Sequence, residues 1–219
     1  TSRLEPVSTR WSSKQGASVI TEVRFWDASG EVPHTALSAN GSAHELELSR
    51  AVNGPLELGY RVRALPFSQS QPLAPALDPD QARLSGEAAY LLPRTADDAV
   101  LTTRLTVDAS PFAPDSLAAS SLGLGSPVSA KVTVAALARS TILIGVLGVA
   151  EFVAPEGVDR AAWLGYSSFD PRSVAAEIAG YRTGVRQALD ARTSGPSMLL
   201  LASDSRRAGE FDVLRRAGS

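Results

Sequence analysis

Hydrophobic and polar residues alternate along most of the first 150 residues, which is the pattern of strands that bury one face. The cleanest alternation runs over residues 56–65 and recurs at 19–25, 44–48, 101–107 and 130–134. In the first of these segments, the residues of the apolar face are Leu56, Leu58, Tyr60, Val62 and Ala64. Turn residues at 28–30, 40–41 and 53–55 separate the early strands and favour hairpins. About seven or eight short strands predict an antiparallel β-sandwich, with an open barrel as the second choice.

Three stretches depart from this alternation. Residues 68–77 and 110–127 are rich in Pro, Ser and Gly, so we expect long surface connections there. The apolar run 141–150 is followed by Glu151 and is much shorter than the roughly 20 residues that cross a bilayer. We therefore expect this run to be buried core and the chain to have no membrane span.

The period changes after Pro155. Asp170 and Pro171 have the form of a helix N-cap and first turn, and the sequence predicts one helix of about five turns that ends before Gly195. The apolar positions at helical spacing are Val174, Ile178, Tyr181, Val185 and Leu189. A buried strand over 197–202, a turn over 204–209 and a second strand over 211–214 follow.

The fold class that these patterns predict is mainly β, with a short α/β segment at the end. The expected domains are a β-sandwich over residues 1–155 and an α/β segment over residues 156–219. A segment of about 60 residues is marginally stable on its own. We therefore expect the second segment to be the incomplete beginning of a larger, catalytic-type domain.

Charge and cysteine content narrow the function classes. The chain has 21 basic and 23 acidic residues, and its arginines are scattered, so nucleic acid is not an expected partner. The absence of cysteine excludes disulfides, thiolate metal sites and cysteine nucleophiles. Because the sequence opens at Thr1 without a leader, a removed leader and a trimmed chain are both open, and a periplasmic or secreted location is favoured. Asn40-Gly41-Ser42 matches a glycosylation acceptor but is interpreted as a turn.

Metal-binding and acid–base residues are sparse. The chain has only two histidines, His34 and His44. His44-Glu45 begins like a zinc-binding motif but continues as Leu-Glu-Leu on a predicted strand, so no second histidine follows at helical spacing. The carboxylate pairs Asp78/Asp80 and Asp97/Asp98 lie beside proline or in charged turns. We interpret both pairs as solvated turn residues.

Other motifs of catalysis are missing or incomplete. No Gly-x-Ser-x-Gly elbow and no Gly-x-x-x-x-Gly-Lys phosphate loop occur, and Gly123-Leu-Gly125 lacks the strand-to-helix setting that a dinucleotide needs. Trp11, Trp26 and Trp163 suit a sugar or peptide groove but are more often core or interface residues. We therefore predict no catalytic, cofactor-binding or metal-binding residue in this chain.

Three segments resemble a known family. Tyr60-Arg-Val-Arg-Ala64, Asp78-Pro-Asp80 and above all Leu84-Ser-Gly-Glu-Ala-Ala-Tyr-Leu-Leu-Pro93 resemble the N-terminal β-domain of the glycyl aminopeptidase family of zinc metallopeptidases. The helix from Asp170 and the strand from Met198 are similar to the opening of that family's thermolysin-like (gluzincin) catalytic domain. Ser85-Gly86 departs from the Asn-Gly usual in the family.

The resemblance implies a bacterial, non-catalytic scaffold that helps shape a substrate groove. The family's H-E-x-x-H helix and its later glutamate ligand would lie beyond Ser219, so zinc is expected only in a full-length parent, and no catalytic residue is carried over. The implied partners are the remainder of its own catalytic domain and a peptide substrate.

Two other hypotheses stay open. The chain is alternatively an exported β-sandwich binding module for peptide or carbohydrate, or a divergent interaction protein without metal. A fragment is expected to leave the apolar strands 198–201 and 211–214 uncovered, whereas an autonomous module is expected to bury them.

Overall fold

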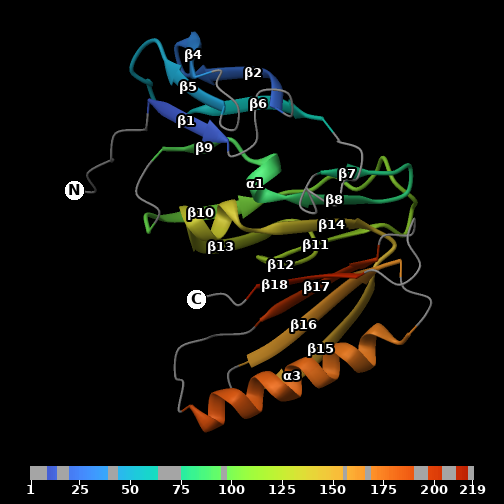
Figure 1. Ribbon diagram of the computed structural model, residues 1–219. Coiled ribbons are helices and arrows are strands. Elements are labelled where there is room, and N and C mark those ends of the chain that lie inside the picture. Colours follow the sequence, from blue (N-terminus) through green and yellow to red (C-terminus); the bar gives the residue numbers. More distant parts are fainter. Residues whose placement is uncertain are drawn as a thin grey trace. The chain divides into compact units, whose positions relative to one another are not determined.

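The computed structural model describes most of the chain in nine stretches. These are residues 9–13, 20–38, 44–63, 75–94, 98–154, 157–165, 169–189, 197–203 and 211–216. The chain divides into two compact units, which are described separately. Unit 1 comprises residues 1–76, 85–101 and 133–139, and unit 2 comprises residues 77–84, 102–132 and 140–219. Figure 1 labels the helices and strands of both units.

Unit 1 contains two antiparallel sheets. One has the strand order β4-β5-β1-β9 and the other has the order β3-β2-β6. The strands of the first are β4 (His34–Ser38), β5 (His44–Leu48), β1 (Arg10–Ser13) and β9 (Leu92–Pro93). Those of the second are β3 (Gly30–Glu31), β2 (Ile20–Asp27) and β6 (Glu57–Val62). Side chains from both sheets meet in one buried cluster, so unit 1 is a small β-sandwich.

The core of unit 1 follows the period-two pattern of the sequence only in part. Leu46 and Leu48 of the buried cluster alternate with half-buried neighbours on β5, whereas the buried Ile20 and Phe25 of β2 are five residues apart because the pairing register shifts between Thr21 and Arg24. The Trp11 ring lies 5.7 Å from the Phe25 ring, measured between centroids, and extends this cluster at its edge. The turn expected at residues 28–30 joins β2 to β3, where Gly30 has a φ of 107°.

Two short helices complete unit 1. They are α1 (Gly86–Ala89) and α2 (Val134–Ala138). α2 begins directly after a strand, because the Thr133 hydroxyl accepts a hydrogen bond from the Ala136 amide and caps the helix. A β-carbon on Gly86 would lie 2.5 Å from the Leu137 carbonyl oxygen, so only glycine allows α1 to approach α2 this closely.

Unit 2 is built from two sheets and one long helix. The first sheet has the order β12-β11-β14-β8-β7, and the second has the order β15-β16-β17-β18. The first sheet comprises β12 (Gly123–Leu124), β11 (Leu117–Ser120), β14 (Thr141–Gly145), β8 (Ala82–Ser85) and β7 (Ala76–Leu77). The second comprises β15 (Gly148–Ala154), β16 (Gly157–Leu164), β17 (Met198–Ser203) and β18 (Phe211–Arg216). A separate pair is formed by β10 (Val100–Leu105) and β13 (Val128–Thr133).

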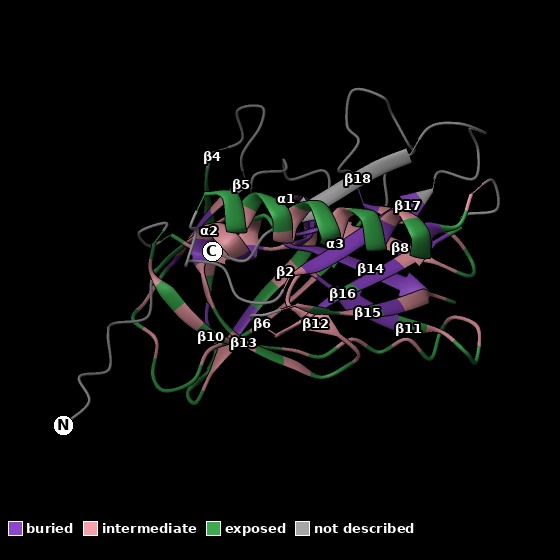
Figure 2. Ribbon diagram, turned by 90° about the horizontal axis from the view of Figure 1, so that it is seen from below, coloured by how far each residue is buried: buried purple, intermediate pink, exposed green. Residues whose placement is uncertain are grey.

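The long helix α3 (Pro171–Ala188) covers one face of the second sheet, and the first sheet covers the other. Leu199 and Leu201 pack with Ala175 of the helix, whereas Met198 and Leu200 pack towards the first sheet. In Figure 2 the strand β16 beside α3 is mainly purple, and much of the outer surface of α3 is green. Unit 2 therefore has three layers, with the second sheet in the middle.

The sequence-based class, mainly β with an α/β end, is confirmed. α3 begins after Asp170 as expected, and the Asp170 carboxylate accepts a hydrogen bond from the Arg172 amide. All five residues of β14 and Ala150 are buried, which confirms the core expectation for these parts of the apolar run 141–150, but Val146 between β14 and β15 is 60% exposed. The expected boundary at residue 155 falls between β15 and β16, which pair with each other as an antiparallel hairpin. Among the described residues, no helix is both long and apolar enough to span a membrane.

One expectation is wrong. Residues 110–127 are not only a surface connection, since β11 lies inside the first sheet and buries Ala118, Ala119 and Ser120. The apolar residues of β17 are buried, which is the outcome expected of an autonomous module, because this strand has a neighbour on each side and a layer on each face. The side chains of β18, the expected turns at 40–41 and 204–209 and most of the 68–77 connection lie outside the described residues.

Candidate functional site

The two histidines are too far apart to share a metal ion. His34 lies opposite Leu48 in the pairing of β4 with β5, and Leu48 is four residues from His44 along β5. At roughly 3.3 Å per residue, the two histidines are separated by about 13 Å along the strands. The His34 ring packs against Phe25 with 5.3 Å between ring centroids. Within the described ranges, no three His, Cys, Asp or Glu residues are grouped so as to hold a metal.

The carboxylates that the sequence singled out belong to turns. Asp78 lies in the connection between β7 and β8, where its backbone amide donates to the Gln81 carbonyl oxygen, and Asp80 is exposed. Asp98 is also exposed, in a turn before β10, and Asp97 lies outside the described residues. The Asp78 carboxylate accepts a hydrogen bond of 3.4 Å from the Gln81 side chain, and neither Asp78, Asp80 nor Asp98 is fully buried as the carboxyl of an acid–base site often is.

The aromatic and glycine candidates also have packing roles. Trp11 belongs to the core of unit 1, and Trp26 covers Gly59 on the neighbouring strand β6. Trp163 of β16 covers Gly148, the opposite residue on β15. Gly123 opens β12, which pairs with β11 and leads into no helix, so it does not form a dinucleotide loop. The structure thus gives each of these residues a packing or pairing role.

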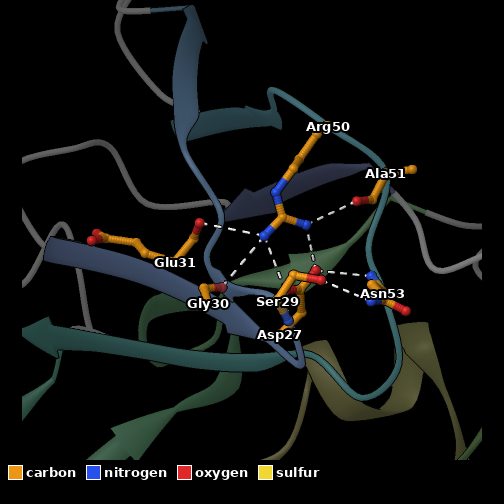
Figure 3. A network of polar contacts seen from close by, with 7 residues as sticks. All are labelled: Asp27, Ser29, Gly30, Glu31, Arg50, Ala51 and Asn53. Atoms are coloured by element: carbon orange, nitrogen blue, oxygen red, sulfur yellow. Dashed lines mark hydrogen bonds and ion pairs between the residues drawn. The ribbon is translucent and has the colours of Figure 1, made fainter.

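The most connected polar group of unit 1 is the carboxylate of Asp27, at the end of β2 (Figure 3). The guanidinium of Arg50 donates to both of its oxygens, at 2.5 and 2.9 Å. The backbone amides of Ser29 and Asn53 each add a hydrogen bond of 2.8 Å. Arg50 also reaches the carbonyl oxygen of Ala51 at 3.1 Å. These bonds tie the β2–β3 turn to the segment that leads into β6, so the network is a structural clamp.

The clamp determines how unit 1 responds to acid. The side-chain hydrogen bond from Arg50, followed by the backbone hydrogen bond from Asn53, holds the pKa of Asp27 well below its ordinary value. A carboxyl whose pKa is lower in the folded state contributes stability above its unfolded-state pKa of about 3.9, and this contribution is lost as the pH falls further.

We expect Asp27→Asn to lower the melting temperature of unit 1 at neutral pH, because the ionic acceptor of Arg50 is removed. The difference from the unchanged chain should be constant above about pH 5 and should shrink below about pH 4. Thermal unfolding monitored by tryptophan fluorescence between pH 2 and pH 8, which are roughly the useful limits for this titration, measures it. Asp98→Asn, in an exposed turn, is the matched control and should leave the melting temperature unchanged. A difference in melting temperature that is the same at every pH would contradict the assignment of an ionic pair between Asp27 and Arg50.

A second polar clamp holds α3 to the second sheet of unit 2. One guanidinium nitrogen of Arg182 donates to both oxygens of Asp159 on β16, at 2.5 and 2.6 Å. The same nitrogen reaches the Ser197 hydroxyl at 2.9 Å, and the Ser197 amide donates to Asp159 at 2.7 Å. The side chains of Arg182 and Asp159 are only 10% and 5% exposed. Burial raises the pKa of the Asp159 carboxyl, but the hydrogen bonds from Arg182 and Ser197 outweigh it and keep the pKa below its ordinary value.

The last turns of α3 carry exposed apolar residues beside this clamp. Tyr181, Val185 and Leu189 are 74%, 56% and 72% exposed, respectively. They follow the small residues Gly180, Gly184 and Ala188, which are exposed as well. These six residues, which we name the α3 outer face, carry no charge over nearly three turns. The helical spacing of apolar residues in the sequence included Tyr181, Val185 and Leu189, but it did not show which of the apolar residues are buried and which are exposed.

The comparisons with known proteins give similarity in structure alone. The sequence matches no known family model and no curated protein. An aminopeptidase N family protein from Idiomarina loihiensis superposes with a TM-score of 0.65 at 15% identity, over 95% of this chain and 40% of that protein. A mutant two-domain M1 zinc metallopeptidase bound to L-arginine gives a TM-score of 0.42 at 16% identity, over 75% and 42% of the two chains. The chain therefore shares the fold of part of the aminopeptidase N family protein and spans 40% of its length.

Proposed function

We propose that the chain is the non-catalytic scaffold part of a larger zinc aminopeptidase of the glycyl aminopeptidase type. The observation that supports this is the fold match over 95% of this chain but only 40% of the aminopeptidase N family protein. The sequence segments 60–64 and 84–93, which resemble the N-terminal β-domain of the glycyl aminopeptidases, point the same way. In such a protein the β-rich part packs against the catalytic part and shapes the groove for the peptide.

Zinc does not fit the residues described in this chain. Two histidines about 13 Å apart and isolated turn carboxylates do not form the set of three or four ligands that zinc requires. Under this proposal the metal and the catalytic carboxylate belong to polypeptide outside these 219 residues. The contribution of the chain is to hold a substrate groove in place, not to carry out chemistry.

A binding module is the second candidate, because the burial of β17 is what that hypothesis expects. The scaffold is favoured by the α3 outer face, since an exposed apolar stripe suits a chain with further polypeptide to pack against it. Trp11, Trp26 and Trp163 each pack against a neighbour within their own unit, which does not favour a sugar or peptide groove lined by them.

The test is to purify the natural gene product and the 219-residue chain side by side. We expect the natural product to be heavier, to contain about one zinc ion per chain by elemental analysis, and to hydrolyse aminoacyl amides. The 219-residue chain is expected to fold, to contain no stoichiometric zinc and to be inactive. A natural product that ends near Ser219 and lacks zinc would refute the proposal in favour of a binding or interaction domain.

A further inference from the structure

The α3 outer face has an unusual chemical composition for a surface helix. Its large residues Tyr181, Val185 and Leu189 recur every four residues and are more than half exposed. A globular protein ordinarily presents charged or polar side chains on the solvent side of such a helix. The other exposed large apolar residues of the described chain, including Leu77 and Val100, lie on separate strands or, for Val146, in a turn, and form no comparable helical row.

The small residues of this face leave room for a close neighbour. A β-carbon placed on Gly180 or Gly184 would meet no atom within 4 Å, so the backbone of the helix is open to the outside at both positions. Glycine in the middle of a helix costs about 1 kcal/mol relative to alanine. Two such residues one turn apart allow a second helix to approach more closely than the usual 8–10 Å between helix axes.

Contacts made by the neighbouring side of α3 hold this surface in place. Arg182 is tied to Asp159 and Ser197, and Ala175 is buried against Leu199 and Leu201. The helix is thereby fixed in rotation, and the outer face cannot turn inward to bury its apolar residues. A partner would thus meet a preformed surface and pay little ordering entropy.

We propose that the α3 outer face is the docking surface for an apolar-faced helix from the remainder of the same longer polypeptide. This inference rests on the proposed function, which supplies that remainder, and it assigns the surface where the two parts meet. The matched aminopeptidase N family protein has more than half of its length outside the match, so polypeptide of sufficient length is a feature of this fold.

The area of the face favours a covalently linked partner over a second copy of the chain. Nearly three turns of helix, about 14 Å long and about 10 Å across, offer roughly 200 Å² on one side. A stable complex of separate proteins buries about 800 Å² on each partner. A segment of the same polypeptide avoids most of the entropy cost of association, so a small face is sufficient for it.

The absence of cysteine from these 219 residues allows a direct test. Val185→Cys places a thiol on the outer face, and Gln187→Cys places a control thiol at another exposed position of the same helix. Both variants are made in the 219-residue chain and in the natural gene product. Maleimide labelling is followed by mass spectrometry of the α3 peptide, so cysteines elsewhere do not interfere.

We expect both thiols to be labelled at similar rates in the 219-residue chain. In the natural product, Val185→Cys should be labelled at least about tenfold more slowly, as local burial requires, and Gln187→Cys should be unchanged. Equal rates for Val185→Cys in the two proteins would overturn the proposal. Protection that appears in the 219-residue chain as its concentration rises would also overturn it, in favour of a second copy.

The zinc content of the same preparations separates this proposal from the proposed function. Protection of Val185→Cys in a natural product without zinc supports the docking surface and refutes the aminopeptidase function. A natural product that contains zinc but leaves Val185→Cys unprotected supports the aminopeptidase function and refutes the docking surface.

Discussion

Replacing Gly86 with alanine is expected to destabilise unit 1 by about 3 kcal/mol or more, at the upper end of the cost of overpacking. The added β-carbon would lie 2.5 Å from the Leu137 carbonyl oxygen and 2.6 Å from that of Ala138. Both contacts are with backbone atoms of α2 and its end, which cannot move aside by changing a rotamer. Gly86 has no positive φ, so the effect comes from space and not from backbone strain.

Hydrogen exchange measured by mass spectrometry during denaturant titration resolves the two units in this experiment. Peptides of unit 1 should lose protection at lower denaturant in Gly86→Ala, while peptides of unit 2 should keep theirs. The matched control is Gly180→Ala, since a β-carbon there meets nothing within 4 Å. This control should stabilise the 219-residue chain by about 0.5–1 kcal/mol, because alanine favours helix. Similar effects of the two substitutions would contradict the close approach of α1 to α2.

The sequence predicted those features of the fold that depend on nearby residues. The start of α3 follows from Asp170 and Pro171 alone, and the capping hydrogen bond to Arg172 confirms it. The strands β5 and β6 follow from simple alternation, because one face of each contributes to the core of unit 1, whereas the register shift within β2 was not predicted. Strand β11 was missed, since Leu117-Ala-Ala-Ser120 has no β-branched residue and lies among Ser, Gly and Pro.

Features that depend on distant residues were not predictable. The apolar spacing of α3 includes Val174 and Tyr181, yet the side that packs on the sheet is centred on Ala175 and Arg182. An arginine is a residue type that is rarely buried without a partner, and Asp159 lies 23 residues away on another element. Of the apolar positions at helical spacing, Ile178 packs against the cluster of Leu199 and Leu201, whereas Tyr181, Val185 and Leu189 near the end of the helix are exposed.

The candidate site residues likewise separate into those that adjacent sequence explains and those that depend on distant residues. The prediction that His44-Glu45 has no second histidine at helical spacing depends only on the adjacent sequence. Whether His34 supplies that second ligand depends on strand register, and β4 pairs with β5 so that His34 faces Leu48. Neither the Asp27 clamp nor the Asp159 clamp was foreseen, because each joins residues from separate parts of the chain.

The buried pair of Asp159 and Arg182 leads to the second large prediction. Arg182→Met keeps much of the volume of the side chain but leaves the Asp159 carboxylate buried with fewer donors. Breaking a buried pair in this way is expected to cost about 3–5 kcal/mol at pH 7. Arg160→Met is the matched control, because Arg160 and Glu151 are paired at 2.7 Å on the same sheet but are 43% and 58% exposed. An exposed pair should contribute at most about 1 kcal/mol.

The pH dependence of the stability that Arg182→Met loses tests whether the loss is electrostatic. In the unchanged chain the pKa of Asp159 is below its ordinary value, so its pairing contributes stability above about pH 4 and is lost as the pH falls. In Arg182→Met, burial without the guanidinium should raise this pKa above about 3.9, so that protonation relieves the unpaired charge at low pH. Chemical denaturation should therefore show a wide difference between the two chains at pH 7 that narrows below about pH 4. Combining Asp159→Leu with Arg182→Met should recover much of the lost stability, because no unpaired charge remains. A loss that is equal at pH 3 and pH 7, or that persists in the double variant, would assign the role of Arg182 to packing.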